Sequence, residues 1–171
     1  MHRSVEETRG QVIGRRIRTI PLVFLAFVLV TVLLPVLLLV ALVVDLARRI
    51  TSGVSFVGLR LVVVLWCFLL GDVAGVLALF GQWVLSGFGR RRAWAVERTW
   101  ALQRRWASWT FAVVRRVFGM SLQVEGDEVV APPPGAPVIV LIRHASIVDN
   151  LLPANLVTAP HDLRLRYVLK R

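Results

Sequence analysis

Two long apolar stretches in the first half of the chain restrict its fold more than any other feature. Pro21 to Val44 contains 24 residues without a charged side chain, and residues 61–88 contain a single one, Asp72. A helix of about 20 residues crosses the ~30 Å hydrocarbon core of a bilayer, so each stretch is long enough. The first stretch exceeds the usual 7–15 apolar residues of a signal peptide, and a second stretch follows it. The sequence therefore predicts a two-helix membrane anchor over residues 21–89.

Details of the two stretches predict departures from plain helices. Pro35 in the middle of the first predicts a kink. The second stretch is longer than one perpendicular crossing needs, so it either tilts strongly or breaks near Gly71 and Asp72. A carboxylate in a membrane segment is a functional candidate, but an Asp72 held inside a helix pair or near the interface needs no catalytic role. Residues 45–58 are expected to form a short connection.

Charge predicts the location and orientation of the anchor. The chain is 57% hydrophobic with a formal net charge of +11, which favours a membrane partner, and no nucleic-acid-binding motif is present. Five arginines lie in residues 1–20 and three more at 90–92, whereas the connection holds two, Arg48 and Arg49. By the positive-inside rule, the basic N-terminus and the segment after residue 89 are both expected on the cytoplasmic side of the cell membrane. The two arginines in the connection leave open a re-entrant hairpin seated in one leaflet.

Residues 90–119 predict an amphipathic interfacial helix, clearest over residues 96–118. At 100° per residue, the arginines of this segment share an arc of about 120°. Arginine on one face with tryptophan on the other is typical of a helix at a lipid headgroup surface. Packing of the apolar face on the protein itself remains equally open. The arginine arc holds Glu97, Arg98, Arg104, Arg105, Ser108, Arg115 and Arg116, and the apolar arc holds Trp100, Leu102, Trp106, Trp109, Phe111, Val113, Val114, Val117 and Phe118.

Beyond the proline-rich residues 132–137, a short polar motif follows an apolar run. The run at residues 138–142 is typical of a buried strand, and α/β sheets place their chemistry where strands end. Directly after it come His144, Ser146 and Asp149. A histidine that takes a proton from an alcohol works best with a carboxylate on its other ring nitrogen. His144 and Asp149 could meet if the histidine lies in the turn and the aspartate in the first turn of a following helix.

A structural reading of the same residues remains open. Asp149 is a good N-cap for a helix that runs from Asn150 to about Val157, and Ser146 could cap the same turn. Pro153 would then lie in or just past the first turn, where the missing N–H costs least. In that case His144 is an ordinary loop histidine.

The motif resembles the His-x4-Asp signature of the glycerophospholipid acyltransferases, which include the 1-acyl-sn-glycerol-3-phosphate acyltransferases. The usual form is Asn-His-x-Ser-x-x-Asp, so that His144, Ser146 and Asp149 match, whereas Arg143 stands where Asn is commoner. The resemblance covers roughly residues 115–171. It implies a fold in which the membrane α-helical hairpin and the amphipathic helix lead into a truncated α/β acyltransferase domain over residues 120–171. Strands are expected at residues 121–124, 138–142 and 163–169.

The resemblance also implies an activity, acyl transfer from an acyl-CoA or acyl-carrier-protein thioester to the hydroxyl of lysophosphatidate. His144 would be the general base and Asp149 its orienting partner. Ser146 and Arg143 are the substrate-binding candidates: Ser146 is expected to shape the turn and not to attack, and Arg143 either meets the phosphate or has only a surface role. The family's Gly-x-x-Phe-x-x-Arg and Phe-Pro-Glu-Gly-Thr-Arg segments, which bind the acceptor phosphate, have no counterpart. The 171 residues are therefore expected to be a fragment without measurable activity of its own.

Other functions remain open on the same residues. A non-catalytic two-helix membrane anchor or sensor needs no His–Asp pair, and a lipid hydrolase could use that pair on water. No cofactor is implied, and no metal, because the histidines lack ligand spacing. The predicted partners are membrane lipid, the acyl donor and lysophosphatidate, and not nucleic acid.

Overall fold

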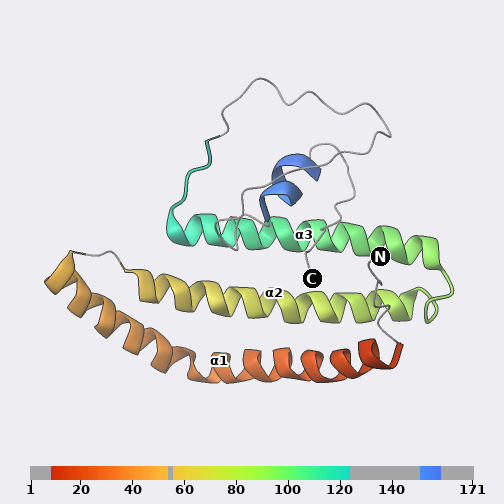
Figure 1. The fold of residues 1–171 in the computed structure, drawn as a ribbon, viewed down its shortest axis with the longest axis horizontal. Coiled ribbons are helices and arrows are strands. Elements are labelled where there is room, and N and C mark those ends of the chain that lie inside the picture. The colour runs from red at the N-terminus through yellow and green to blue at the C-terminus, as the bar shows by residue number, and fades with distance from the viewer. Residues whose placement is uncertain (1–8, 54–55, 124–150, 159–171) are drawn as a thin grey trace, which may run out of the picture. The chain divides into compact units, whose positions relative to one another are not determined.

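The computed structural model describes residues 9–53, 56–123 and 151–158, and all regular structure in them is helical. Three long helices are followed by a short π-helix (Figure 1). The chain divides into two compact units, Met1–Leu77 and Ala78–Arg171, with the boundary inside the second helix. The elements are α1 (Arg9–Ser52), α2 (Val57–Leu85), α3 (Arg92–Phe118) and η2 (Ala154–Thr158).

Helix α1 contains the first apolar stretch and extends past it at both ends, over 44 residues. Pro21 and Pro35 lie inside it, and Figure 1 shows α1 bending along its length. Proline removes one backbone donor and pushes against the preceding turn, so an internal proline is the expected cause of a bend. The helix ends where Gly53, at φ 65°, donates its backbone N–H to Arg49 O at 3.1 Å. A left-handed glycine at this place is a common helix stop.

Helix α2 runs antiparallel to α1 within the unit Met1–Leu77 (Figure 1). The connection is residues 53–56 and not the expected 45–58, because both helices continue into it. Helix α2 passes through Gly71 and Asp72 without interruption, so a break at this point, one of the two expectations, is wrong. A glycine costs about 1 kcal/mol in a helix interior, which does not outweigh the long apolar sequence on both sides.

Both α1 and α2 are long and apolar enough to cross a membrane, and only a small share of either apolar segment is buried inside the protein. Large aliphatic side chains are exposed on both helices, including Leu25 of α1 at 64% and Leu77 of α2 at 56%. Water-soluble monomers rarely expose apolar patches of this extent. The two helices thus have the length, composition and surface of membrane helices, as the sequence predicted.

A tight turn over residues 86–90 links α2 to α3. Ser86 is fully buried; its hydroxyl donates to Trp83 O at 2.7 Å and accepts from Gly89 N at 3.0 Å. Phe88 adopts φ 58°, a backbone conformation that residues other than glycine rarely take. Its ring meets the Trp83 ring edge-on, with the two centroids 4.9 Å apart. Helix α3 then runs to Phe118 and stops at Gly119, in the left-handed conformation.

The predicted α/β domain is not found, and the fold class assigned from the sequence is wrong in this respect. Residues 9–53, 56–123 and 151–158 contain no strand. The first expected strand, at residues 121–124, is irregular and exposed over residues 121–123. An isolated segment gains no ladder hydrogen bonds and buries no face, so its local sequence is not enough to make it a strand. The expected strands at 138–142 and 163–169 lie outside the described residues.

Candidate functional site

The predicted catalytic pair, His144 and Asp149, lies outside the described residues, as do Ser146 and Arg143. Their geometry therefore stays a prediction. The chain is described again from Leu151, where residues 151–153 are helical and lead into η2. This agrees with the helix expected from Asn150 to about Val157.

The short helical segment after the motif belongs to the same compact unit as α3 and packs against it. Pro153 is buried in the segment's first turn, the position that suits a residue without a backbone donor. Asn155 donates its side-chain Nδ2 to Leu151 O at 2.8 Å. The sequence directly downstream of Asp149 is thus anchored on the surface of α3.

Helix α3 has one buried stripe, formed by Ala107, Thr110, Phe111 and Val114. The spacing of three, four and seven residues places these side chains on one helical face. The Thr110 hydroxyl is buried and has no hydrogen-bond partner within the described part of the chain. The sequence left open whether the apolar side of this helix contacts lipid or packs on the protein. In this region it packs on the protein itself.

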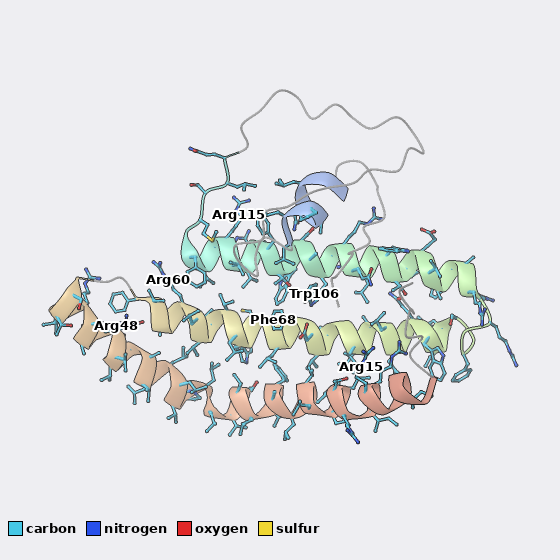
Figure 2. All side chains as sticks on the ribbon, in the orientation of Figure 1. Arg15, Arg48, Arg60, Phe68, Trp106 and Arg115 are labelled. Carbon is cyan, nitrogen blue, oxygen red and sulfur yellow. The ribbon has the colours of Figure 1, made fainter. Side chains whose placement is uncertain are left out.

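The opposite side of α3 carries an exposed row that we call the Arg–Trp face, made of Trp94, Arg98, Arg105, Trp109 and Arg116. The guanidinium of Arg98 lies over the Trp94 ring at 5.3 Å from its centroid, a cation–π distance. Arg115 and Trp106 project from opposite sides of the same helix (Figure 2).

The place of Trp109 corrects the expectation from the sequence, which put it on the apolar arc. It is 38% exposed. Because Trp109 precedes Arg116 by seven residues, or nearly two helical turns, the two are about 20° apart around the helix. The seven-residue spacing to Arg116 indicates this position on the helix, but a large aromatic side chain is readily assigned to the apolar arc.

A second polar site lies where α1 meets α2. The Asp45 side chain, on α1, is buried at 2% exposure. Its two oxygens accept hydrogen bonds from the backbone N–H groups of Gly58 at 3.0 Å and Leu59 at 2.8 Å, both in the first turn of α2. The carboxylate satisfies donors that a helix N-terminus leaves without an internal partner. Asp45 therefore caps α2 from the neighbouring helix.

The same pair of helices is joined again within their apolar segments. Trp66 of α2 donates its indole N–H to the Thr31 hydroxyl of α1 at 3.1 Å. The Trp66 ring also lies 6.5 Å from the Phe27 ring, centroid to centroid. The hairpin thus has two polar links, one beside the connection and one deep in the apolar segment, neither of which the sequence analysis anticipated.

One further candidate from the sequence lies within the described residues. Asp72 lies half-buried in α2, and a functional role for it stays a prediction. Within the described residues, no group of three His, Cys, Asp or Glu side chains could hold a metal ion. Comparison of the chain with protein-family models, with curated proteins and with solved structures finds no match.

Proposed function

We propose that this protein is a membrane-embedded O-acyltransferase that moves a fatty acyl group from an acyl-CoA or acyl-carrier-protein thioester to a lysophospholipid hydroxyl, with lysophosphatidate as the expected acceptor. The observation that carries the proposal is the sequence over residues 143–149, a His-x4-Asp motif with Ser146 between the pair. A helical segment follows it at once, at residues 151–158, as a helix beginning near Asp149 would require. The proposal rests on this motif and on the apolar helices and does not depend on a particular fold for the residues around the motif.

The chemistry requires a base for one proton and a partner for that base. The imidazole of His144 takes the proton of the acceptor hydroxyl while the hydroxyl oxygen attacks the thioester carbonyl. The C–S bond breaks, and the leaving thiolate recovers the proton from the imidazolium. Asp149 holds the tautomer of His144 and stabilises its charged form. Ser146 shapes the turn, and Arg143 binds the acceptor phosphate.

The membrane part of the proposal draws on α1, α2 and the turn after them. Phe80, Trp83 and Phe88 make ring contacts at the end of α2, and Arg90 to Arg92 follow directly. Aromatic side chains at the interface with arginines just beyond are the pattern of a cytoplasmic membrane boundary. We therefore place the N-terminus and the catalytic residues on the cytoplasmic side of the cell membrane, with the hairpin either spanning the bilayer or re-entering from one leaflet.

The proposal is tested by substitutions in the chromosomal gene, so that the residues act in the protein as the cell makes it. Membranes are assayed for transfer of labelled acyl groups to lysophosphatidate, with the amount of protein measured by immunoblot. A positioned general base contributes about 10²–10⁴-fold to rate, so His144→Ala should reduce turnover by that range. Asp149→Asn should be comparably severe, because an amide cannot stabilise the imidazolium.

The same assay separates catalysis from helix capping. Asparagine caps a helix as well as aspartate does, so near-normal activity in Asp149→Asn would assign Asp149 a structural role. Ser121→Ala, at an exposed position outside the motif, is the control and should retain most activity. If membranes with and without the gene transfer acyl groups equally, the acyltransferase proposal is wrong.

A non-catalytic membrane anchor is the second candidate, and a specific observation favours it. The described residues include an apolar hairpin and a basic amphipathic helix, which together suffice for an anchor. Unchanged acyl transfer in every variant, together with membrane retention of the protein, would support this candidate.

A further inference from the structure

We infer that the Arg–Trp face of α3 binds the surface of an anionic lipid bilayer, with its guanidinium groups on headgroup phosphates and Trp109 among the headgroups. The inference rests on described residues of the unit Ala78–Arg171 alone. It is independent of acyl transfer, so that either proposal can fail without the other.

The first step concerns solvent exposure: the Arg–Trp face is exposed, whereas the opposite side of the helix is buried. Arg98, Arg105 and Arg116 are exposed, and the buried stripe at Ala107 to Val114 lies on the opposite side. Trp94 and Trp109 are 37% and 38% exposed. A large aromatic side chain left open in a row of arginines suits an interface that is apolar at one depth and wet at the next.

The second step is charge. Helix α3 contains six arginines and one acidic residue, Glu97, which gives it a formal charge of +5. Its partner must therefore be anionic. Each arginine near an anionic bilayer surface strengthens binding roughly fivefold, so the three arginines of the face together contribute roughly a hundredfold.

The third step is location, which favours lipid over other anionic partners such as nucleic acid. Six residues separate the end of α2 at Leu85 from the start of α3 at Arg92. The Gln82 side chain donates to Arg98 O at 3.4 Å, which ties the second turn of α3 to the last turn of α2. The end of an apolar helix is where headgroups are found, so the Arg–Trp face starts beside its proposed ligand.

The experiment uses the full chain with its single cysteine replaced, Cys67→Ala, and one new cysteine, Ser108→Cys, for an environment-sensitive fluorophore. Ser108 is exposed and precedes Trp109. Gln103→Cys is the matched control, because Gln103 is also exposed but lies about 140° away around the helix. Each labelled protein is placed in nanodiscs of phosphatidylcholine alone or of equimolar phosphatidylcholine and phosphatidylglycerol. Quenching by acrylamide, a neutral molecule, reports contact with water.

We expect the label at position 108 to be quenched several-fold less in anionic than in neutral nanodiscs, and the label at 103 to be unchanged. High salt should reverse the protection, and changing Arg98, Arg105 and Arg116 together to Gln should abolish it. Changing the same three to Lys should preserve it, because bilayer attraction needs the charge and not the guanidinium geometry. The Gln and Lys triple variants fold alike if their circular dichroism spectra agree.

Three results would overturn the inference. Equal quenching at position 108 in the two kinds of nanodisc would show that anionic lipid does not bind the face. Protection that persists in the Gln variant would show that protein, not lipid, covers it. Protection by added RNA in neutral nanodiscs, with none from anionic lipid, would identify a nucleic-acid surface instead.

Discussion

Asp45 shows how one side chain can link the two helices of the apolar hairpin. From the sequence it was expected to begin the connection, because it is the first charged residue after the apolar run. In the structure it lies seven residues before the end of α1 and caps α2 instead. A local N-cap is visible in a sequence because it precedes its own helix directly. A cap that reaches across from another helix has no such signature, and only the packing of α1 on α2 reveals it.

The contact between Asp45 and Gly58 predicts that Gly58→Ala changes stability in opposite directions with and without the Asp45 carboxylate. A Cβ on Gly58 would lie 3.0 Å from Asp45 Oδ1, and that oxygen is fixed by its hydrogen bond. Gly58→Ala should therefore destabilise the hairpin despite the higher helix propensity of alanine. With Asp45→Ala already present, the obstacle is gone, and Gly58→Ala should stabilise by up to about 1 kcal/mol.

The measurement is reversible unfolding of the purified protein in mixed detergent micelles, followed by circular dichroism. Asp45→Ala alone should lower the free energy of unfolding, because it leaves two backbone donors of α2 without a partner. Asp45→Asn, which keeps one acceptor oxygen, should lower it less. A Gly58→Ala effect of the same sign and size in both backgrounds would show that the close approach has no energetic consequence.

Among the elements, the long helices were predictable and their faces were only partly so. Composition and length identified α1 and α2, and the amphipathic pattern over residues 96–118 ends where α3 ends, at Phe118. The partition of α3 was less accurate, since Trp109 was assigned by hydrophobicity rather than by its angle relative to Arg116. A strand is expected from the sequence at residues 121–124, but residues 121–123 are irregular. Whether such a segment forms a strand is decided by a pairing partner, which no local pattern contains.

The pairing of α1 with α2 predicts a measurable hydrogen bond between Thr31 and Trp66. Thr31→Val removes the acceptor and leaves the indole N–H of Trp66 without a partner in an apolar setting. Interhelical hydrogen bonds in membranes contribute about 0.6 kcal/mol on average, with a maximum near 1.7, so Thr31→Val should destabilise by an amount in that range. Trp66→Phe removes the donor as well as part of the ring.

A double-mutant cycle isolates the bond from the loss of packing. The combined variant, Thr31→Val with Trp66→Phe, should be destabilised by less than the sum of the single changes. The readout is again unfolding in mixed micelles. Strict additivity would mean that the 3.1 Å contact contributes nothing to the stability of the hairpin.

On the scale of the whole molecule, the two long apolar helices were predicted correctly, whereas the predicted α/β fold of the last third was wrong. Long apolar runs identify possible membrane helices by length and composition alone, so this prediction does not depend on exact helix boundaries. A catalytic site depends on residues brought together by the fold, and the expected sheet domain is absent from the part of the chain that the structure describes. The helical segment at 151–158 was predictable because its signals, a capping aspartate and an early proline, are local. His144 and Asp149 are close in sequence, and their contact in space remains a prediction.

Retention in the membrane is the prediction that belongs to the whole chain. The full protein, and a shorter chain that ends at Gly89, should both stay with the membrane pellet after washes in high salt and in alkaline carbonate. Screening shortens the range of charge interactions to about 3 Å at 1 M salt, but it does not weaken burial of apolar side chains such as Leu25 and Val32, which are exposed on the protein.

The matched control changes only the apolar surface. Val32→Arg together with Leu65→Arg places a charge on the exposed side of each helix, at a cost of about 2.5–3.5 kcal/mol per arginine in the centre of a membrane helix. This variant should appear in the carbonate supernatant to a measurably greater extent than the original chain. Salt should weaken the binding of the Arg–Trp face to lipid, because that binding depends on charge. The hairpin should stay embedded when the face detaches. Release of the unmodified chain by carbonate would contradict both the spanning and the re-entrant hairpin, because each requires α1 and α2 to be buried in lipid.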